Sequence, residues 1–285
     1  MEGVGLEKNQ WVFGSDYNLS FLTPSRFSSE SSSSDDDSHA GSIYLQSFTP
    51  FVIYGLSSDL NILSTLPILY WHQNAEHSDA HHRNETVFGI GDITIGARWL
   101  IKNQSFGPGQ RLFIGLDVSV PTGESYENNP FSSDADSINH RHFALGDGLV
   151  SSNINFEWWH RSEYSYVFGI VGRYSFPWKK SDIGFLPGTK YWLNLHAIRQ
   201  RPLFAGIFPY LKLLINLEAP DYWGRIKAKN SGGKMVEGMV GLDLEINEKI
   251  TAVISFNIPI WRTLKGNQLD SYTLAASFRV LWHRH

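Results

Sequence analysis

Four histidines in one polar stretch of the chain are the residues best suited to metal chemistry: His72, His77, His81 and His82. Imidazole nitrogen binds Zn²⁺ and Cu²⁺, and nearby carboxylates such as Glu76 or Asp79 could complete a ligand shell. The spacing matches no compact ligand motif, and a flexible loop loses conformational entropy when it closes on a metal. The sequence therefore favours a solvated polar loop. A zinc or copper site remains the alternative, and no other cofactor is implied.

Two further histidines, His160 and His196, have the side chain that a general base in nucleophilic catalysis needs. Such a base must lie beside a serine or another nucleophile and be oriented by a third group. Neither histidine has an evident serine partner, and nothing in the sequence resembles a nucleophile elbow. The sequence predicts a protein that is not an enzyme, with a lipid hydrolase as the alternative.

A larger set of charged or titratable residues recurs at alternate positions within apolar stretches. These residues are Asp92, Arg98, Asp117, Glu157, Arg173, His196, Lys212, Glu237, Asp243 and Arg279. Alternation with a period of two is typical of a β-strand, whose successive side chains point to opposite faces. In residues 93–101, for example, the isoleucines and Trp99 share one face, and Thr94 and Arg98 share the other.

The alternating pattern recurs about twelve times and predicts an all-β chain. The expected strands lie near 11–21, 42–54, 61–71, 89–101, 112–120, 149–159, 164–176, 190–198, 207–217, 236–246, 252–260 and 272–282. The long connections, near 22–41, 72–86, 121–147, 177–189, 218–233 and 262–270, alternate with short ones. Outer-membrane barrels have an even number of strands, with short turns at one end and long loops at the other. A soluble sandwich has no reason to alternate in this way.

Tryptophan placement supports the same interpretation, because nearly all ten tryptophans fall at or near an expected strand end. Indole is enriched at the interface between membrane and water, where its ring is apolar and its N–H is hydrated. We therefore expect residues 1–285 to form a single domain, an antiparallel up-and-down transmembrane β-barrel of about 12 strands in the outer membrane of a bacterium.

Composition excludes several other classes of protein. Apolar residues make up 42% of the 285 residues and charged residues only 18%, yet there is no run of 18 apolar residues that could form a transmembrane helix. The net charge of −4 and the absence of a basic stripe argue against binding to nucleic acid. The absence of cysteine excludes disulfides. The N-terminus lacks a basic region followed by an apolar one, so we expect that a signal peptide has been removed.

The expected location implies partners. Acidic residues gather in the first three long loops and basic residues in the last three. This asymmetry could orient a charged solute or bind lipopolysaccharide, or it could serve loop solubility alone. Outer-membrane lipid is a further expected partner. The aromatic alternation of the last strand resembles the signal read by the barrel assembly machinery, which we expect to act during insertion.

Three glycine-rich motifs carry a resemblance to a known family. The segment 89–96 reads G-I-G-D-I-T-I-G, the strand at 118–123 ends in P-T-G, and Gly146-Asp147-Gly148 precedes the next strand. Together they resemble the outer-membrane transporter family labelled MetA-pathway phenol-degradation protein. The resemblance covers roughly residues 89–156, and it implies a porin-like outer-membrane channel or transporter. The phenol-pathway label says little about the cargo.

The predicted function is passive or weakly selective passage of small molecules through a polar lumen lined by the ten charged or titratable residues named above. Two interpretations of these residues stay open. They could select solutes in an open pore, or they could form a charge network that fills a narrow barrel. The alternatives to a channel are an outer-membrane barrel enzyme of the lipid hydrolase type and a closed structural or metal-binding barrel.

Overall fold

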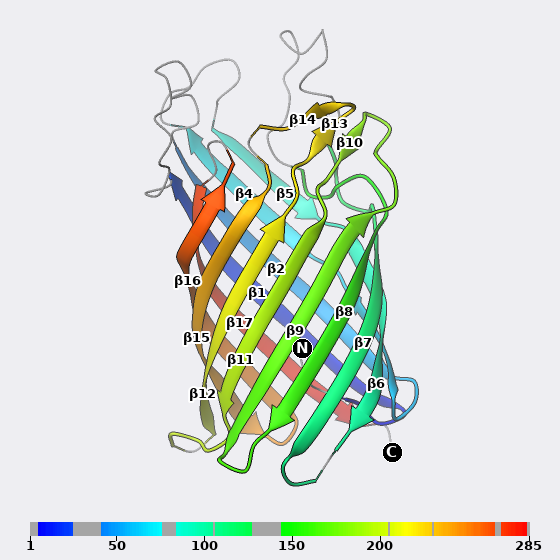
Figure 1. The fold of residues 1–285 in the computed structure, drawn as a ribbon, viewed down its shortest axis with the longest axis vertical. Coiled ribbons are helices and arrows are strands. Elements are labelled where there is room, and N and C mark those ends of the chain that lie inside the picture. The colour runs from blue at the N-terminus through cyan, green and yellow to red at the C-terminus, as the bar shows by residue number, and fades with distance from the viewer. Residues whose placement is uncertain are drawn as a thin grey trace.

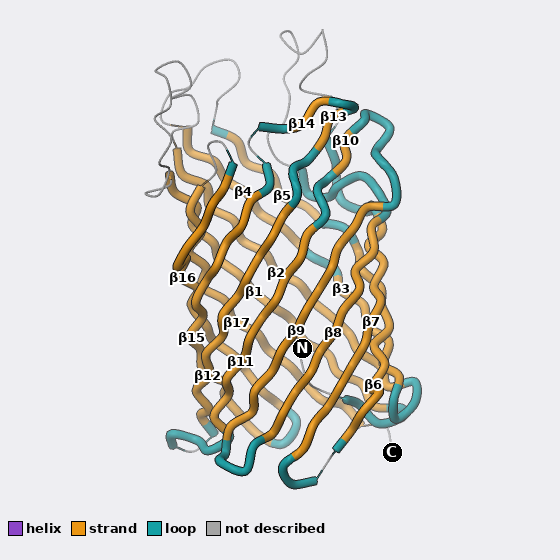
Figure 2. The backbone as a smooth tube through the Cα atoms, in the orientation of Figure 1, coloured by secondary structure: helices purple, strands orange, loops and turns teal. Residues whose placement is uncertain are grey.

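The computed structural model describes residues 5–24, 41–75, 84–104, 106–126, 144–204, 206–229, 231–265 and 269–283. Within these ranges the regular secondary structure consists of β-strands (Figure 2). The described part of the chain contains no helix that is long and apolar enough to cross a membrane.

Fourteen strands form one antiparallel sheet, and three two-residue strands form a small second sheet. The large sheet contains β1 (Gln10–Pro24), β2 (Gly41–Gly55), β3 (Leu60–Thr65), β4 (Ile68–Ala75), β5 (Glu85–Ile90), β6 (Ile93–Asn103), β7 (Gly109–Val120), β8 (Ser151–Arg161), β9 (Tyr166–Pro177), β11 (Lys190–Arg199), β12 (Ile207–Glu218), β15 (Gly233–Asn247), β16 (Ile250–Leu264) and β17 (Leu269–His283). The small sheet contains β10 (Phe185–Leu186), β13 (Tyr222–Trp223) and β14 (Ile226–Lys227).

The large sheet closes on itself. The strand order is β1-β17-β16-β15-β12-β11-β9-β8-β7-β6-β3-β2, and β2 pairs with β1 to complete a ring of twelve (Figure 1). Strand β4 pairs with residues 41–48 of β2, and β5 pairs with β4, so these two strands extend the wall toward the long-loop end. The predicted twelve-stranded antiparallel barrel is therefore confirmed. One end of the barrel carries short turns, and the other carries the long connections and the small sheet.

Two expected strands are interrupted where the sequence pattern predicted continuous ones. The strand expected at 61–71 breaks at Leu66 and Pro67, and the one expected at 89–101 breaks at Gly91 and Asp92. Proline has no N–H to donate to a ladder, so it interrupts pairing inside a sheet. The two breaks meet, because the Gly91 N–H donates to the Pro67 carbonyl at 2.7 Å. At this break the wall divides into a part formed by β3 and β6 and a part formed by β4 and β5.

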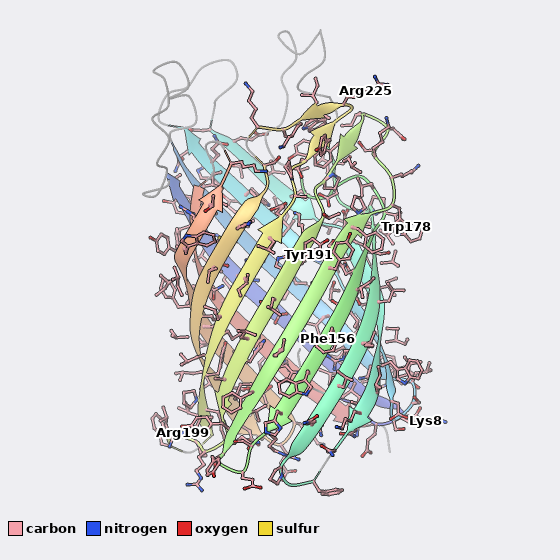
Figure 3. All side chains as sticks on the ribbon, in the orientation of Figure 1. Lys8, Phe156, Trp178, Tyr191, Arg199 and Arg225 are labelled. Atoms are coloured by element: carbon pink, nitrogen blue, oxygen red, sulfur yellow. The ribbon has the colours of Figure 1, made fainter. Side chains whose placement is uncertain are left out.

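The outer surface of the barrel is an apolar band. Alternate side chains such as Ile95, Leu116 and Phe156 point outward and are about half exposed (Figure 3). Their neighbours along each strand, such as Arg98 and Asp117, are buried in the interior. This alternation is the arrangement a barrel needs when lipid surrounds it and polar groups face its lumen.

The lumen is filled by apolar side chains at the short-turn end. The segment before β1 turns into the barrel, where Leu6 is buried against Val12, Phe51 and Ile53. A second cluster, of Leu100, Phe113 and Trp159, lies beside it. Gly5 connects the two clusters, since a side chain at this position would touch Leu100 and Phe113. The N-terminal segment therefore occupies the short-turn end of the lumen.

The register of the last strand can be tested by placing the same charge on its two faces. Leu274 points outward and is 45% exposed, whereas Ala275 points inward opposite Asn18 and Ser255. We predict that Leu274→Arg lowers the yield of inserted, heat-modifiable barrel severalfold, because an arginine facing mid-depth lipid costs about 2–4 kcal/mol. Ala275→Arg, which places its charge in the lumen, is expected to retain most of the yield. Equal losses in the two variants would contradict the register.

Candidate functional site

A buried ion pair crosses the interior between β6 and β8. The Arg98 Nη1 donates to Glu157 Oε1 at 2.8 Å, and both side chains are less than a tenth exposed. Trp159 Nε1 donates to the other carboxylate oxygen at 3.1 Å. Strand β7 lies between the partners, and Gly115 occupies the position directly beside Arg98 on it. Because Gly115 has no side chain, Arg98 can cross β7, and its guanidinium carbon lies 4.5 Å from the centre of the Phe113 ring.

A second polar chain lies next to the ion pair. Asn155 on β8 donates from Nδ2 to Asp117 Oδ2 at 2.7 Å and accepts from Arg173 Nε at 2.8 Å. Asp117 is buried, but Arg173 is exposed to the lumen. The Asp117 carboxylate fits because its direct neighbour on β6 is Gly96, where any side chain would collide with it. The structure thus brings together Arg98, Asp117, Glu157 and Arg173, all of which were expected to face inward.

The other side of the lumen holds a looser set of polar groups. Glu237 on β15 is buried and accepts from Asn216 Nδ2 at 3.3 Å. Lys212 on β12 extends over the Tyr210 ring, with its nitrogen 5.4 Å from the ring centre. Asp243 and Arg279 are half-buried in the inward register of β15 and β17. His196 is buried, and its imidazole lies 4.9 Å from the Trp159 ring.

Asp92 has a different position from the other expected lumen residues. It lies in the break between β5 and β6, where its carboxylate accepts the Gly123 N–H at 2.9 Å and the Asp147 N–H at 3.0 Å. These two amides belong to the P-T-G and G-D-G motifs, so one side chain joins the three glycine-rich motifs of the sequence. Thr122 reinforces the junction, since its hydroxyl donates to the Gly91 carbonyl at 2.9 Å. Asp92 thereby fixes the connection between β7 and β8 to the break in the wall.

At the long-loop end the described parts of three connections pack together, and we call this cluster the cap (Figure 1). Its core is an aromatic trio of Tyr126, Phe185 and Trp223, with ring centres 4.7–5.4 Å apart. Beside this trio Lys190 pairs with Glu218 at 2.9 Å, and Asp221 accepts the Gly188 N–H at 2.7 Å. The alternating pattern of strands gave no signal for this cap. Its aromatic residues lie in irregular segments of the sequence, without a period.

Burial in the cap shifts the pKa values of its titratable groups. Burial raises the pKa of Asp147 and of Asp221 above the ordinary aspartate value, against the opposing effects of the Lys190 ammonium on both and of the Gly188 N–H on Asp221. Burial, and then the Asp221 and Asp147 carboxylates, raise the pKa of the Tyr126 hydroxyl to about 12. An acid whose pKa is raised by folding destabilises the fold while it is charged, and this cost disappears as the pH falls through the raised pKa. The burial of Asp147 and Asp221 therefore costs the fold less stability at acidic pH than at neutral pH.

Of the four histidines considered for metal binding, only His72 lies within the described residues. Its Nδ1 is 2.7 Å from the Thr86 hydroxyl and its Nε2 is 3.0 Å from Asn74 Oδ1, so both ring nitrogens already have partners in the wall. His77, His81 and His82 lie outside the described residues. Within the described part of the chain no cluster of three or more metal-ligating side chains occurs. The metal site stays a prediction.

Comparison with known proteins places the chain in a family. The family model described as putative MetA-pathway of phenol degradation matches residues 13–199, which is more than half of the chain. The chain belongs to this family. The resemblance drawn from the three glycine-rich motifs is therefore confirmed. A comparison with curated proteins finds no match.

Solved structures support the fold of this MetA-pathway family member. The COG4313 outer membrane channel from Pseudomonas putida F1 aligns with a TM-score of 0.74 and 11% identity, over 97% of both chains. The beta domain of the Bordetella autotransporter BrkA aligns with a TM-score of 0.53 and 11% identity, over 96% of this chain and 99% of that one. At such identities the likeness establishes the barrel fold alone.

The ion pair can be tested with a double-mutant cycle. We predict that Arg98→Met lowers the free energy of unfolding by about 3–5 kcal/mol, because it leaves the Glu157 carboxylate buried and unpaired. The double variant Arg98→Met/Glu157→Gln should recover much of this loss, since the glutamine is neutral and can still accept from Trp159. Urea unfolding in detergent micelles measures both values. A double variant as unstable as the single one would contradict the assignment.

The role of Asp92 makes a separate prediction for the loops. We expect Asp92→Ala to speed amide hydrogen exchange at Gly123 and Asp147, since each hydrogen bond to a charged acceptor contributes about 1.5–3 kcal/mol. Exchange in the middle of β7 should not change. Asp182→Ala, which removes an exposed loop carboxylate, is the matched control. Unchanged protection at both amides in Asp92→Ala would show that the carboxylate does not hold the loops.

Proposed function

We propose that this protein is an outer-membrane channel that lets small molecules pass passively and with weak selectivity. The observation that carries the proposal is the contrast between the apolar outer wall and the hydrogen-bonded polar interior of a closed twelve-stranded barrel. A hydrophilic route through lipid needs a wall of this kind. The structural likeness to an outer membrane channel from Pseudomonas putida F1 is consistent with it.

The orientation follows from the loops. In outer-membrane barrels the short turns face the periplasm and the long loops face the outside. The cap of Tyr126, Phe185 and Trp223 then lies at the extracellular mouth, and the apolar clusters around Leu6 lie at the periplasmic end. Outer-membrane lipid, lipopolysaccharide at the loops and the assembly machinery during insertion remain the expected partners.

The charges of the lumen have unequal parts in this proposal. Arg98 is neutralised by Glu157 at 2.8 Å, so it contributes mainly to the rigidity of the wall. Arg173 is hydrogen-bonded to Asn155 through Nε alone among the described contacts and is exposed to the lumen. A solute in the passage therefore meets the Arg173 guanidinium more readily than that of Arg98. Arg173 is the better candidate for a selectivity residue.

Single-channel recording in planar bilayers tests the selectivity. We predict that Arg173→Gln shifts the reversal potential under a salt gradient toward cation selectivity, because the remaining wall becomes more acidic. The combined neutralisation of Arg98 and Arg173 should shift it further. Arg225→Gln, which removes an exposed cation of the cap, is the control (Figure 3).

The same recordings test the passage itself. Removal of residues 1–8 takes away Leu6 and its contacts with Val12 and Phe51, so we expect a higher conductance than in the full chain. Negligible conductance with and without these residues would contradict the channel and favour the closed structural barrel. Adding micromolar Zn²⁺ or Cu²⁺ to the bath on the long-loop side tests the histidine loop, since block should disappear when His77, His81 and His82 are replaced by alanine.

The enzymatic alternative receives less support from the geometry. The His196 ring is inclined at 58° to the Trp159 ring, with the ring centres 4.9 Å apart. The His160 ring is nearly parallel to the Trp158 ring, with the ring centres 6.0 Å apart. In both cases the described neighbour of the imidazole is an indole. A barrel hydrolase would instead hold its histidine beside a serine hydroxyl.

A further inference from the structure

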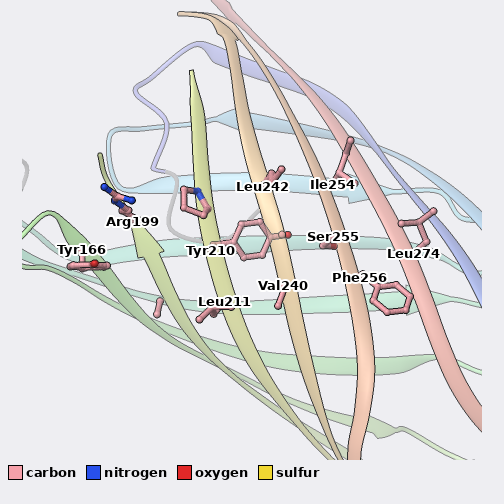
Figure 4. A pocket seen from close by; sticks show the side chains of 13 residues that line it. Tyr166, Arg199, Tyr210, Leu211, Val240, Leu242, Ile254, Ser255, Phe256 and Leu274 are labelled. Carbon is pink, nitrogen blue, oxygen red and sulfur yellow. The ribbon is translucent and has the colours of Figure 1, made fainter. Parts of the chain in front are cut away.

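The lipid-facing wall carries a groove of about 600 Å³ on the face formed by β9, β11, β12, β15, β16 and β17 (Figure 4). Its volume lies within the range of about 300–1,000 Å³ that is typical of small-ligand sites. The groove lies outside the lumen, because most of the side chains that line it belong to the outward register. It is therefore separate from the passage described above.

Two neighbouring rows of outward side chains form the sides of the groove. The first row crosses the strands through the register pairs Ala197–Leu211, Leu211–Val240, Val240–Phe256 and Phe256–Leu274. All five side chains of this row are apolar. The row therefore offers a continuous hydrocarbon surface along the hydrogen-bonding direction of the sheet.

The second row has a polar end. It contains Pro209, Leu242 and Ile254, and it ends at the register pair of Arg199 and Tyr166. Between the rows the floor is backbone, because the intervening residues Tyr210, Gly241 and Ser255 belong to the inward register, where the Tyr210 ring packs over Gly241. The groove is thus apolar along most of its length and cationic at one end.

The two ends of the groove lie at different depths in the bilayer. Ala197 lies two residues from the short-turn end of β11, whereas Leu274 lies nine residues from the same end of β17. The four strand-to-strand steps between them span about 19 Å at about 4.8 Å each. One leaflet of hydrocarbon is about 15 Å deep, half of the bilayer core. The groove is therefore long enough for one extended acyl chain.

The cationic end lies at the level of the lipid headgroups. Arg199 is the last residue of β11, and its side chain extends at the short-turn end of the barrel (Figure 3). Within the described part of the chain no ion pair or hydrogen bond engages its guanidinium. Guanidinium binds phosphate through two parallel hydrogen bonds, and the Tyr166 hydroxyl opposite adds a third donor.

We propose that this groove binds one glycerophospholipid of the periplasmic leaflet, with its phosphate at Arg199 and Tyr166 and one acyl chain along the row from Ala197 to Leu274. The charge of Arg199 complements an anionic phosphate, and its level in the membrane matches the leaflet in which phospholipid headgroups face the periplasm. The site would hold an annular lipid in a fixed position on this wall. It does not depend on whether the lumen conducts.

Native mass spectrometry of the full chain, extracted into mild detergent from outer membranes, tests the site. We expect a retained adduct with the mass of one phospholipid. Arg199→Gln should lower the retained fraction about fivefold, which corresponds to about 1 kcal/mol for one basic residue near a lipid surface. Ala197→Phe, which adds a ring to the first row and so narrows the groove, should lower it by a similar factor.

Two matched variants serve as controls, and heat-modifiable migration in gels verifies the fold of every variant. Lys249→Gln removes an exposed cation from another short turn, and Leu195→Phe enlarges an outward side chain on the same strand outside the groove. Both should retain the adduct. The proposal is overturned if the parent retains no phospholipid, if the controls lose it as fully as the groove variants, or if the groove variants instead abolish a dimer of the chain.

Discussion

The structure depends on one constraint, which is that every backbone N–H and C=O inside the hydrocarbon layer needs a hydrogen-bond partner in the protein. Strand β1 satisfies this requirement on both edges, since it pairs with β17 over fifteen residue pairs and with β2 over twelve. Closure then dictates that side chains alternate between lipid and lumen. Polar groups on the inner face are in turn crowded together, so they pair with one another, as Arg98 does with Glu157.

The break in the wall shows how the same constraint is met where the ladder of backbone hydrogen bonds is interrupted. Pro67 and Asp92 interrupt two neighbouring strands, and β7 ends at Val120, so among the described strands β5 pairs only with β4. The connection between β7 and β8 approaches the exposed edge instead. Leu145 packs close to Gly89, and its N–H is bound to the Glu124 carbonyl at 2.8 Å. The carboxylate of Asp92 accepts the hydrogen bonds of the loop amides, as the carbonyls of a neighbouring strand do elsewhere in the wall.

The sequence was sufficient for the barrel because its signal is local. The period of two, the alternation of long and short connections and the positions of tryptophan can all be recognised within one or two strands. The partners in the lumen could not be predicted in this way. Arg98 and Glu157 are 59 residues apart, and their contact depends on the register of β6, β7 and β8 and on the missing side chain of Gly115. The sequence identified Asp92 as a charged residue in a strand, but its role required the position of two distant loops.

The occupied short-turn end of the lumen also has a signal in the sequence, although only the structure explains it. In β2 and β6 the alternation fails near that end, where Phe51, Val52 and Ile53, or Leu100 and Ile101, are apolar on both faces. Apolar side chains that point inward need a cover, and Leu6 of the N-terminal segment supplies part of it. Burying one leucine side chain stabilises the fold by about 1.5–3 kcal/mol. The segment is also held to β2 by hydrogen bonds, since the Asn9 N–H donates to the Gly55 carbonyl at 2.8 Å and the Tyr54 hydroxyl donates to Asn9 Oδ1 at 2.9 Å. The occupied short-turn end thus depends on apolar burial and on hydrogen bonds together.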